Sequence, residues 1–401
     1  MRLVHRTGVV AALGAAQTLA WASSYYLPAM LAAPMAQDLG VATPTIFAAF
    51  SFALLISALL GPYAGQAIDR WGGRPVLMAT SLVFAIGLGW LGSVQTVAGL
   101  FAAWAVLGIG MGSGLYEAGF SALVRLYGRD SRSAITGITL IAGFASTVGW
   151  PLSTLMETHV GWRGACYGWA VLHLVPGLLL NGLLPSATPH RAAPSAHDAA
   201  ARNAAPGSLR ASILLAIVFA VTWFTSTAMA AHLPRLLTAG GVTLASAVAA
   251  GALVGPAQVG ARVLEFGILR RVHPLLSARL ACLMHPAGAA LFLTLGGPAA
   301  AAFVICHGAG NGILTIAKGT LPLVLFGPQG YGHRQGLLMV PARIAQAVAP
   351  WLFGLTLDRW GDSALWLSSL LGLVAFLALV GLGAFTDDKR EAHDAATTVR
   401  S

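Results

Sequence analysis

Five charged side chains interrupt the long apolar segments of this sequence: Glu117, Arg262, Glu265, Lys318 and Arg343. A charge inside a membrane costs roughly 2.5–3.5 kcal/mol on insertion scales, so each of them requires an explanation. A guanidinium can hold a carboxylate or another oxyanion through two parallel hydrogen bonds. A carboxyl group in an apolar setting can carry a proton. These residues therefore indicate anion binding and proton transfer. Three histidines in apolar segments could also titrate: His173, His285 and His307.

The two arginines are the predicted anion ligands. Gln258 lies four residues before Arg262, so the two side chains share one face of a helix. The alternative for Arg262 is a gate ion pair with Glu265, three residues further on. Arg343 lies about two turns from either end of its segment, which argues against snorkelling to the interface. Lys318 lies about two turns from one end of its segment, where snorkelling is the simpler interpretation.

Glu117 is the predicted proton-coupling residue. Its alternative role is to neutralise Lys318 or Arg125. A substrate cavity would also need polar and aromatic walls. The residues that could complete it are Tyr25, Trp223 and Asn311, for which ordinary helix packing is an equally good explanation.

The composition predicts an all-α integral membrane protein in a lipid bilayer. Of 401 residues, 57% are hydrophobic and only 9% are charged, whereas soluble proteins carry about 25% charged residues. No long alternating segments suggest a β-barrel. The net charge of +10 comes from basic residues at helix ends without a dense run, so nucleic acid is not an expected partner. The three cysteines fit neither zinc nor disulfide spacing.

Enzymatic activity is not expected. The sequence has no phosphate-binding loop of the G-x-x-x-x-G-K-S/T type and no His/Glu cluster with metal-ligand spacing. Asp69 and Asp358 are isolated carboxylates rather than a catalytic pair. We therefore expect no catalytic residues, no metal and no cofactor.

Hydropathy predicts twelve transmembrane helices of about 20 residues. The first six lie near 8–32, 44–67, 76–94, 97–124, 133–156 and 162–184. The last six lie near 211–236, 244–268, 275–295, 298–325, 335–357 and 362–385. The predicted domains are an N-terminal six-helix bundle (1–185), a cytoplasmic linker rich in Ala, Pro and Ser (186–210), a C-terminal six-helix bundle (211–385) and a charged, disordered cytoplasmic tail (386–401). The N-terminus resembles a signal peptide, but its apolar run is long enough to be a retained first helix.

The basic residues predict the orientation. Of the 23 lysines and arginines, 17 fall on one side of this layout and three on the other. The positive-inside rule then places both termini in the cytoplasm. We expect a multi-pass monomer in the bacterial cytoplasmic (inner) membrane. The halves also repeat: the glycines of 110–114 match those of 308–312, and Pro151 matches Pro350. Two parallel six-helix repeats with a central site between them are typical of transporters.

The loop at 61–75 carries the strongest motif. Gly61 and Gly65 lie one helical turn apart, so a neighbouring helix can approach closely there. Asp69, Arg70 and Arg74 follow where the helix must end. This stretch resembles the loop between the second and third helices of the major facilitator superfamily, with pattern G-x-x-x-D-R-x-G-R-R. The resemblance implies twelve helices in two pseudo-symmetric bundles. The residues predicted to gate the transporter are Gly65, Asp69, Arg70, Arg74 and, through the internal repeat, Glu265.

Two further segments resemble one branch of this superfamily. The stretch 255–262 resembles the eighth helix of monocarboxylate porters, with Gln258 where the family has an acidic residue. The pair Ala342-Arg343 stands where oxalate/formate antiporters have Ala-Lys. The resemblance implies a secondary active transporter that moves a small organic anion, a carboxylate, by alternating access, coupled to protons or anion exchange. The predicted substrate ligands are Arg262, Arg343, Gln258, Tyr25, Trp223 and Asn311. The alternatives are efflux of a toxic compound such as a drug or metalloid and, more remotely, a non-transporting membrane sensor.

Overall fold

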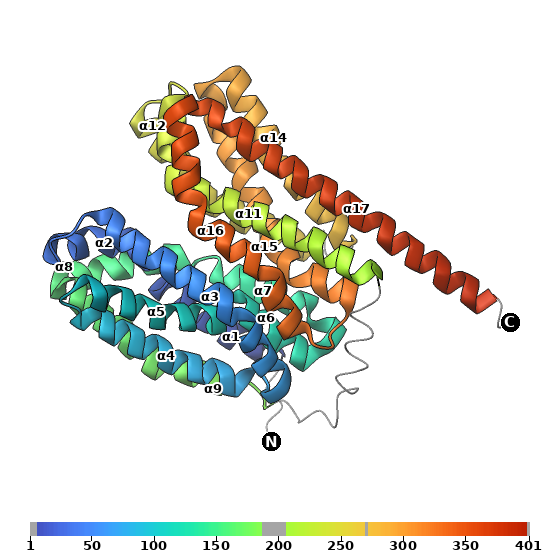
Figure 1. Ribbon diagram of the computed structural model, residues 1–401, viewed down its shortest axis with the longest axis horizontal. Helices are drawn as coiled ribbons and strands as arrows, with labels where there is room; N and C mark the ends of the chain where they lie inside the picture. The colour runs from blue at the N-terminus through green and yellow to red at the C-terminus, as the bar shows by residue number, and fades with distance from the viewer. Residues whose placement is uncertain (1–5, 187–205, 269–271, 399–401) are drawn as a thin grey trace. The chain divides into compact units, whose positions relative to one another are not determined.

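The computed structural model describes residues 6–186, 206–268 and 272–398, and every regular element in these ranges is helical (Figure 1). The chain divides into two compact units. The first comprises residues up to His190 together with Pro328–Ala347, and the second comprises Arg191–Gly327 and the residues from Val348 onward. Contacts thus group 328–347 with the first unit, whereas the sequence assigned this stretch to the bundle 211–385. The predicted domain limits themselves stay a prediction.

The first unit contains nine α-helices and two short turns among its described residues up to 186. The helices are α1 (Arg6–Ser23), α2 (Leu27–Asp38), α3 (Thr43–Trp71), α4 (Gly73–Ser93), α5 (Val97–Gly114), α6 (Tyr116–Tyr127), α7 (Arg132–Ala142), α8 (Ala145–Leu172) and α9 (Leu178–Gly182). A 3₁₀ turn, η1 (Gly128–Ser131), precedes α7, and a π-helical turn, η2 (His173–Gly177), separates α8 from α9. α3 packs along α5, and α4 packs against both α5 and α8 (Figure 1).

The second unit is built on long helices. They are α11 (Pro206–Ala239), α12 (Leu244–Gly251), α13 (Val254–Gly267), α14 (Pro274–Leu295), α15 (Ala300–Phe326) and α17 (Leu365–Thr398), with 3₁₀ turns η4 (Gly297–Ala299) and η5 (Gly361–Ala364). α14 packs against α15 and α17, and α17 also packs along α11 (Figure 1). α16 (Tyr331–Trp360) contributes residues to both units.

Several predicted spans are interrupted in the structure. The span expected at 8–32 is two helices, because the chain turns at residues 24–26 between α1 and α2. The span at 97–124 breaks at Leu115, and the span at 244–268 breaks between α12 and α13. The turn implied between the predicted spans 133–156 and 162–184 is confirmed, since Gly161 has φ 72° inside α8. A hydropathy window averages over such breaks and therefore could not reveal them.

Eight continuous helical stretches of the described residues are long and apolar enough to cross a membrane. One of them, 86 residues from Val97 to Gly182, is long enough for more than one crossing, so this number is not a count of spans. Large apolar side chains such as Leu59, Trp351 and Leu377 are exposed, as expected for surfaces that face lipid. The twelve-helix count stays a prediction.

The predicted linker (186–210) and the predicted tail (386–401) lie outside the two predicted bundles. Most of the linker, 187–205, lies outside the described residues. The disorder expected from Thr386 is wrong for most of the tail, because α17 continues as a helix to Thr398. The residues beyond Thr386 include Lys, Arg, Glu and Ala, which are good helix formers, so extension of the helix is consistent with their intrinsic preference.

Candidate substrate-binding site

A break in the fourth predicted span positions Glu117. Glycine occupies every second position from Gly108 to Gly114, and glycine lowers helix stability. These glycines allow close packing: a Cβ on Gly112 would come within 3.0 Å of the Ser57 carbonyl oxygen of α3. α5 ends at Gly114, Leu115 is extended with ψ −167°, and α6 begins at Tyr116. Glu117 therefore lies in the first turn of α6, where the helix dipole favours a negative charge.

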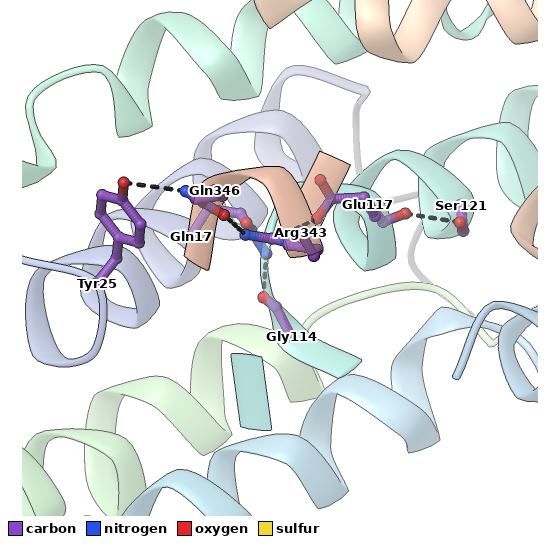
Figure 2. Close-up of polar contacts among 7 residues, drawn as sticks. All are labelled: Gln17, Tyr25, Gly114, Glu117, Ser121, Arg343 and Gln346. Atoms are coloured by element: carbon purple, nitrogen blue, oxygen red, sulfur yellow. Dashed lines mark hydrogen bonds and ion pairs between the residues drawn. The ribbon is translucent and has the colours of Figure 1, made fainter. Parts of the chain in front are cut away.

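The broken backbone is stabilised by a buried side chain. The Gln17 amide nitrogen on α1 donates a hydrogen bond of 2.7 Å to the Gly114 carbonyl oxygen at the end of α5 (Figure 2). Only 1% of Gln17 is exposed. A carbonyl freed by a helix end in apolar surroundings needs such a donor. Gln17 was not among the residues predicted for the site, because the break that requires it was not predicted.

Arg343 is the centre of a buried polar cluster, which we define as Tyr25, Glu117, Arg343 and Gln346 (Figure 2). The Arg343 Nη2 donates to Glu117 Oε2 at 2.9 Å, and Nη1 donates to Gln346 Oε1 at 3.0 Å. The Gln346 Nε2 donates in turn to the Tyr25 hydroxyl at 2.9 Å. Side-chain exposure is 3% for Arg343 and 15% for Glu117, so a carboxylate and an amide share one largely desolvated guanidinium.

The cluster borders a small cavity within the first unit, with about 10 Å³ of space for the centre of a water-sized guest. Its walls come from α3, α5, α6 and α16, and include Ser57, Gly61, Glu117, Gly336 and Arg343. On the other side of the cluster, Tyr25 packs edge-on against Trp21 and Phe50 at centroid distances of 5.2 and 5.5 Å. Both charged groups of the ion pair are thus at the wall of one cavity, backed by aromatic rings.

Four of the predicted gate residues lie near the end of α3 and the start of α4: Gly65, Asp69, Arg70 and Arg74. The two carboxylate oxygens of Asp69 accept hydrogen bonds of 2.9 Å from the backbone N–H groups of Gly332 and His333. These N–H groups belong to the first turn of α16 and have no partner within that helix, so Asp69 caps α16. The close approach predicted at Gly65 is confirmed, because a Cβ there would overlap the Gly332 carbonyl group. Arg74 donates to the Ser186 hydroxyl at 3.2 Å, and the Arg70 guanidinium lies 5.7 Å from the Trp71 ring centroid.

The remaining predicted ligands lie in the second unit. Arg262 Nη2 donates to Gln258 Oε1 on the same face of α13 at 3.4 Å, and Glu265 is buried on the same helix. Trp223 supports Lys318, whose Nζ lies 3.9 Å from the ring centroid. Asn311 lines a separate cavity in this unit, with about 40 Å³ of space for the centres of water-sized guests. The structure therefore joins Arg343, Glu117 and Tyr25 in one cluster, while the joint action of Arg262 and Arg343 stays a prediction.

Sequence reasoning missed three features of the site: the Arg343–Glu117 pair and Gln346 within the cluster, and Gln17 beside it. Gln346 lies three residues after Arg343, a spacing that places both on one helix face and could have indicated their contact. The Glu117 partners considered from sequence were Lys318 and Arg125. The alternating glycines before Leu115 were the available signal for a helix break. No group of three or more His, Cys, Asp or Glu side chains among the described residues is placed to hold a metal ion.

The sequence matches the Major Facilitator Superfamily profile over residues 13–340, so the chain belongs to this superfamily. Its members are transporters, and this chain is accordingly a multi-pass membrane transporter rather than an enzyme. A search of curated proteins gives no significant match.

Solved structures agree on the fold. The human organic anion transporter MFSD10 (TETRAN) superposes with a TM-score of 0.68 at 17% identity, covering 94% of this chain and all of that one. FucP in the outward conformation gives 0.74 at 14% identity, covering 92% and 97% of the two chains. The proton:xylose symporter XylE gives 0.68 at 14% identity, covering 93% and 94%. Identities this low establish a shared architecture and leave the substrate to be argued from the site.

Proposed function

We propose that the protein is a secondary active transporter of a small organic anion, a carboxylate, whose central ligand is Arg343. The observation that carries this proposal is the buried Arg343–Glu117 ion pair at the wall of a cavity. A guanidinium that already binds one carboxylate has the geometry to bind another of similar shape. Glu117 then acts as an internal stand-in for the substrate, which must displace it to reach Arg343.

Charge balance predicts how substrate binding at Arg343 is coupled to protonation of Glu117. An unpaired charge in desolvated surroundings is strongly unfavourable, and breaking a buried ion pair typically costs about 3–5 kcal/mol. When a carboxylate substrate occupies Arg343, Glu117 loses its cation and is most stable when protonated. One proton would therefore enter with each monoanion, because protonated Glu117 releases the arginine. Exchange of one anion for another on Arg343 would need no net proton movement.

Alternating access would follow from the architecture shared with other members of the superfamily. Asp69 is proposed to hold α3 against α16 in one state through its two backbone hydrogen bonds, and to release them in the other. Arg262 and Gln258 are proposed as a second polar anchor for the substrate. Glu265 is proposed as a gate residue, because it corresponds to Asp69 in the internal repeat of the two halves.

The test is uptake of radiolabelled mono- and dicarboxylates into proteoliposomes, with a sugar and a cationic drug as other cargo classes. Arg343→Gln should abolish carboxylate uptake and binding, while Arg235→Gln is the matched control. Arg235 pairs with Asp358 and more than half of each side chain is exposed, so its loss should leave uptake unchanged. Unchanged carboxylate uptake in Arg343→Gln, or transport of only the sugar or the drug, would overturn the proposal.

A further inference from the structure

A second cavity in the first unit is lined by buried polar groups that the anion site does not use. It lies between α1, α4, η2 and α9 and leaves about 10 Å³ for the centre of a water-sized guest, which is room for about one water. Among the residues that line it are Gln17, His173 and Asn181, whose exposed fractions are 1%, 2% and 7%. Each of the three has one buried atom that receives no hydrogen bond from the described part of the chain: Gln17 Oε1, His173 Nδ1 and Asn181 Oδ1.

In both amides, Gln17 and Asn181, the atom without a hydrogen bond is the oxygen. Asn181 Nδ2 donates to the Leu77 carbonyl oxygen at 3.3 Å and to Ser81 Oγ at 3.0 Å. Gln17 Nε2 donates to the Gly114 carbonyl oxygen at 2.7 Å. A carbonyl oxygen can only accept, so the nitrogen of each amide is fixed by its partner. The remaining atom of each amide is therefore an acceptor.

The hydrogen bonds of Ser23 are compatible with one particular tautomer of His173. Ser23 Oγ donates its single proton to the Leu19 carbonyl oxygen at 2.8 Å. With its proton on that carbonyl, Ser23 Oγ accepts the 2.7 Å hydrogen bond from His173 Nε2, and we assign His173 this tautomer, in which Nε2 carries the proton. His173 Nδ1 is left with a lone pair, so it is the third acceptor in the lining of this cavity.

His173 is positioned by the π turn η2, which contains Pro176. Pro176 has no N–H, so it cannot make the α-helical bond to the Leu172 carbonyl oxygen. The helix widens into a π turn, in which the Leu178 N–H bonds the His173 carbonyl oxygen. π turns within helices are frequent at functional sites. The His173 ring stacks on Phe84 at a centroid distance of 4.8 Å, which leaves an aromatic face beside the acceptors.

We propose that this cavity is a binding site for one water-sized monovalent cation, either sodium or a hydrated proton, held by Gln17, His173 and Asn181. A buried acceptor without a donor is unfavourable, so a guest that satisfies all three is strongly favoured. A single water donates only two hydrogen bonds. A sodium ion or a hydronium ion can satisfy all three acceptors at once. If the proton resides on His173 instead, one water can accept a hydrogen bond from His173 and donate to the two amide oxygens.

The lining selects against other ions. It includes no carboxylate, and divalent cations are usually held by carboxylates. His173 is the one titratable side chain among the residues that line the cavity. The packed helices α1 and α4 each carry one charged residue, Arg6 and Arg74, and neither lines it. α8 carries Glu157, His159, Arg163, Cys166 and Tyr167, which are also outside the lining. A single positive charge is therefore the best match to this site.

The inference rests on the proposed function only in naming the cation as a coupling ion. Gln17 links the cavity to the anion site, since its Oε1 belongs to the proposed cation site and its Nε2 stabilises the helix end before Glu117. Cation binding can be measured without transport. Cation binding without carboxylate transport would leave this site standing and refute the anion proposal, whereas carboxylate transport without cation binding would do the reverse.

The test is thermal unfolding of the purified full-length protein in detergent. In one arm, sodium chloride replaces choline chloride at constant ionic strength and alkaline pH. In the other arm, pH is lowered from about 8 to about 5.5 in choline chloride. A sodium site gives a saturable rise in unfolding temperature with sodium. A proton site gives a rise as pH falls, because a folded state that binds the proton more tightly gains stability at low pH.

Asn181 provides paired variants. Asn181→Leu should raise the half-saturating sodium concentration at least about tenfold, because one ligand to a charge is lost. Asn181→Asp keeps the ligand oxygen and adds a negative charge, so it should lower that concentration about tenfold or move the acid stabilisation to higher pH. His173→Gln should remove the acid stabilisation. Thr225→Val removes a buried unpaired hydroxyl from the cavity of the second unit and should change neither response. No response of the wild type in either arm, or responses unaltered by both Asn181 variants, would overturn the proposal.

Discussion

The two arginines predicted as anion ligands have different surroundings. Arg343 makes bonds of 2.9 and 3.0 Å to the Glu117 carboxylate and the Gln346 amide. Arg262 makes a bond of 3.4 Å to the amide of Gln258, which is long for a hydrogen bond. A carboxylate can be protonated and an amide cannot. We therefore expect protonation of Glu117 to release Arg343.

The largest expected effect is on the α3–α16 contact that holds the first unit around Arg343. Gly65→Ala places a methyl group on the Gly332 carbonyl, a backbone group that cannot move aside locally. We expect loss of several kcal/mol of stability or loss of the state in which the two helices touch. Gly61→Ala is the matched control, because the nearest atoms to its Cβ lie 3.9 Å away. Unfolding temperature and cysteine cross-linking between the two helices would measure both variants, and equal behaviour would contradict the close approach.

The second effect concerns the ion pair itself. Arg343→Gln leaves Glu117 without its cation and should lower stability by about 3–5 kcal/mol, unless the carboxyl becomes protonated. The double variant Arg343→Gln/Glu117→Gln should recover most of this loss, while carboxylate transport stays absent. A double-mutant cycle of unfolding temperatures gives the coupling between the two residues. Additive losses would show that the pair contributes no coupling energy.

The third effect separates the two arginines. Arg262→Gln should weaken carboxylate binding about tenfold, the value of one charged hydrogen bond, and leave its pH dependence unaltered. Glu265→Gln distinguishes the alternative role of Arg262: if the two residues form a gate pair, this variant changes turnover more than affinity. Titration of substrate against unfolding temperature measures affinity. Lost pH dependence in Arg262→Gln would remove the contrast between the two arginines.

The fourth effect concerns turnover. Asp69→Asn keeps the size of the side chain but replaces one acceptor oxygen by a donor, so one of its two bonds to the start of α16 is lost. We expect a rate of exchange altered several-fold with substrate affinity within about twofold, as for loss of one cap worth about 1 kcal/mol. Arg70→Gln, which retains the cap, is the comparison. Reduced affinity with unchanged turnover would contradict the gate assignment of Asp69.

The smallest effect is expected at Lys318. Trp223→Phe keeps an aromatic face but weakens the cation–π contact with Lys318. Unfolding temperature should fall by the equivalent of about 0.5–2 kcal/mol, with carboxylate affinity unchanged if Trp223 only supports the lysine. A large loss of affinity would instead favour the predicted role of Trp223 as a substrate ligand.

The fold was predictable because its signals are local. Apolar length identifies membrane helices, and the glycines and charges of 61–75 mark the superfamily loop that the family match supports. The i to i+4 contact of Gln258 with Arg262 was predictable for the same reason. The Arg343–Glu117 pair was not, because its residues lie 226 positions apart and meet through a helix break at Leu115. The break follows a run of glycines that pack closely against α3, and hydropathy does not describe such packing.

The three unpaired acceptors of the second cavity were beyond sequence reasoning for a similar reason. His173 was noted only as a titratable residue in an apolar segment. Its role depends on which nitrogen bonds Ser23, 150 residues away, and on the π turn that Pro176 produces. Neither hydropathy nor residue spacing carries this information.

The central claim is that Glu117 and the substrate carboxylate compete for Arg343. The most direct measurement is carboxylate affinity at several pH values for the wild type and Glu117→Gln, with Glu157→Gln as the matched control outside both cavities. The account predicts that wild-type affinity increases as pH falls. It also predicts that Glu117→Gln binds the carboxylate at least about tenfold more tightly at neutral pH, with no further gain on acidification. Weaker binding in Glu117→Gln, or an unaltered pH dependence, would contradict the claim.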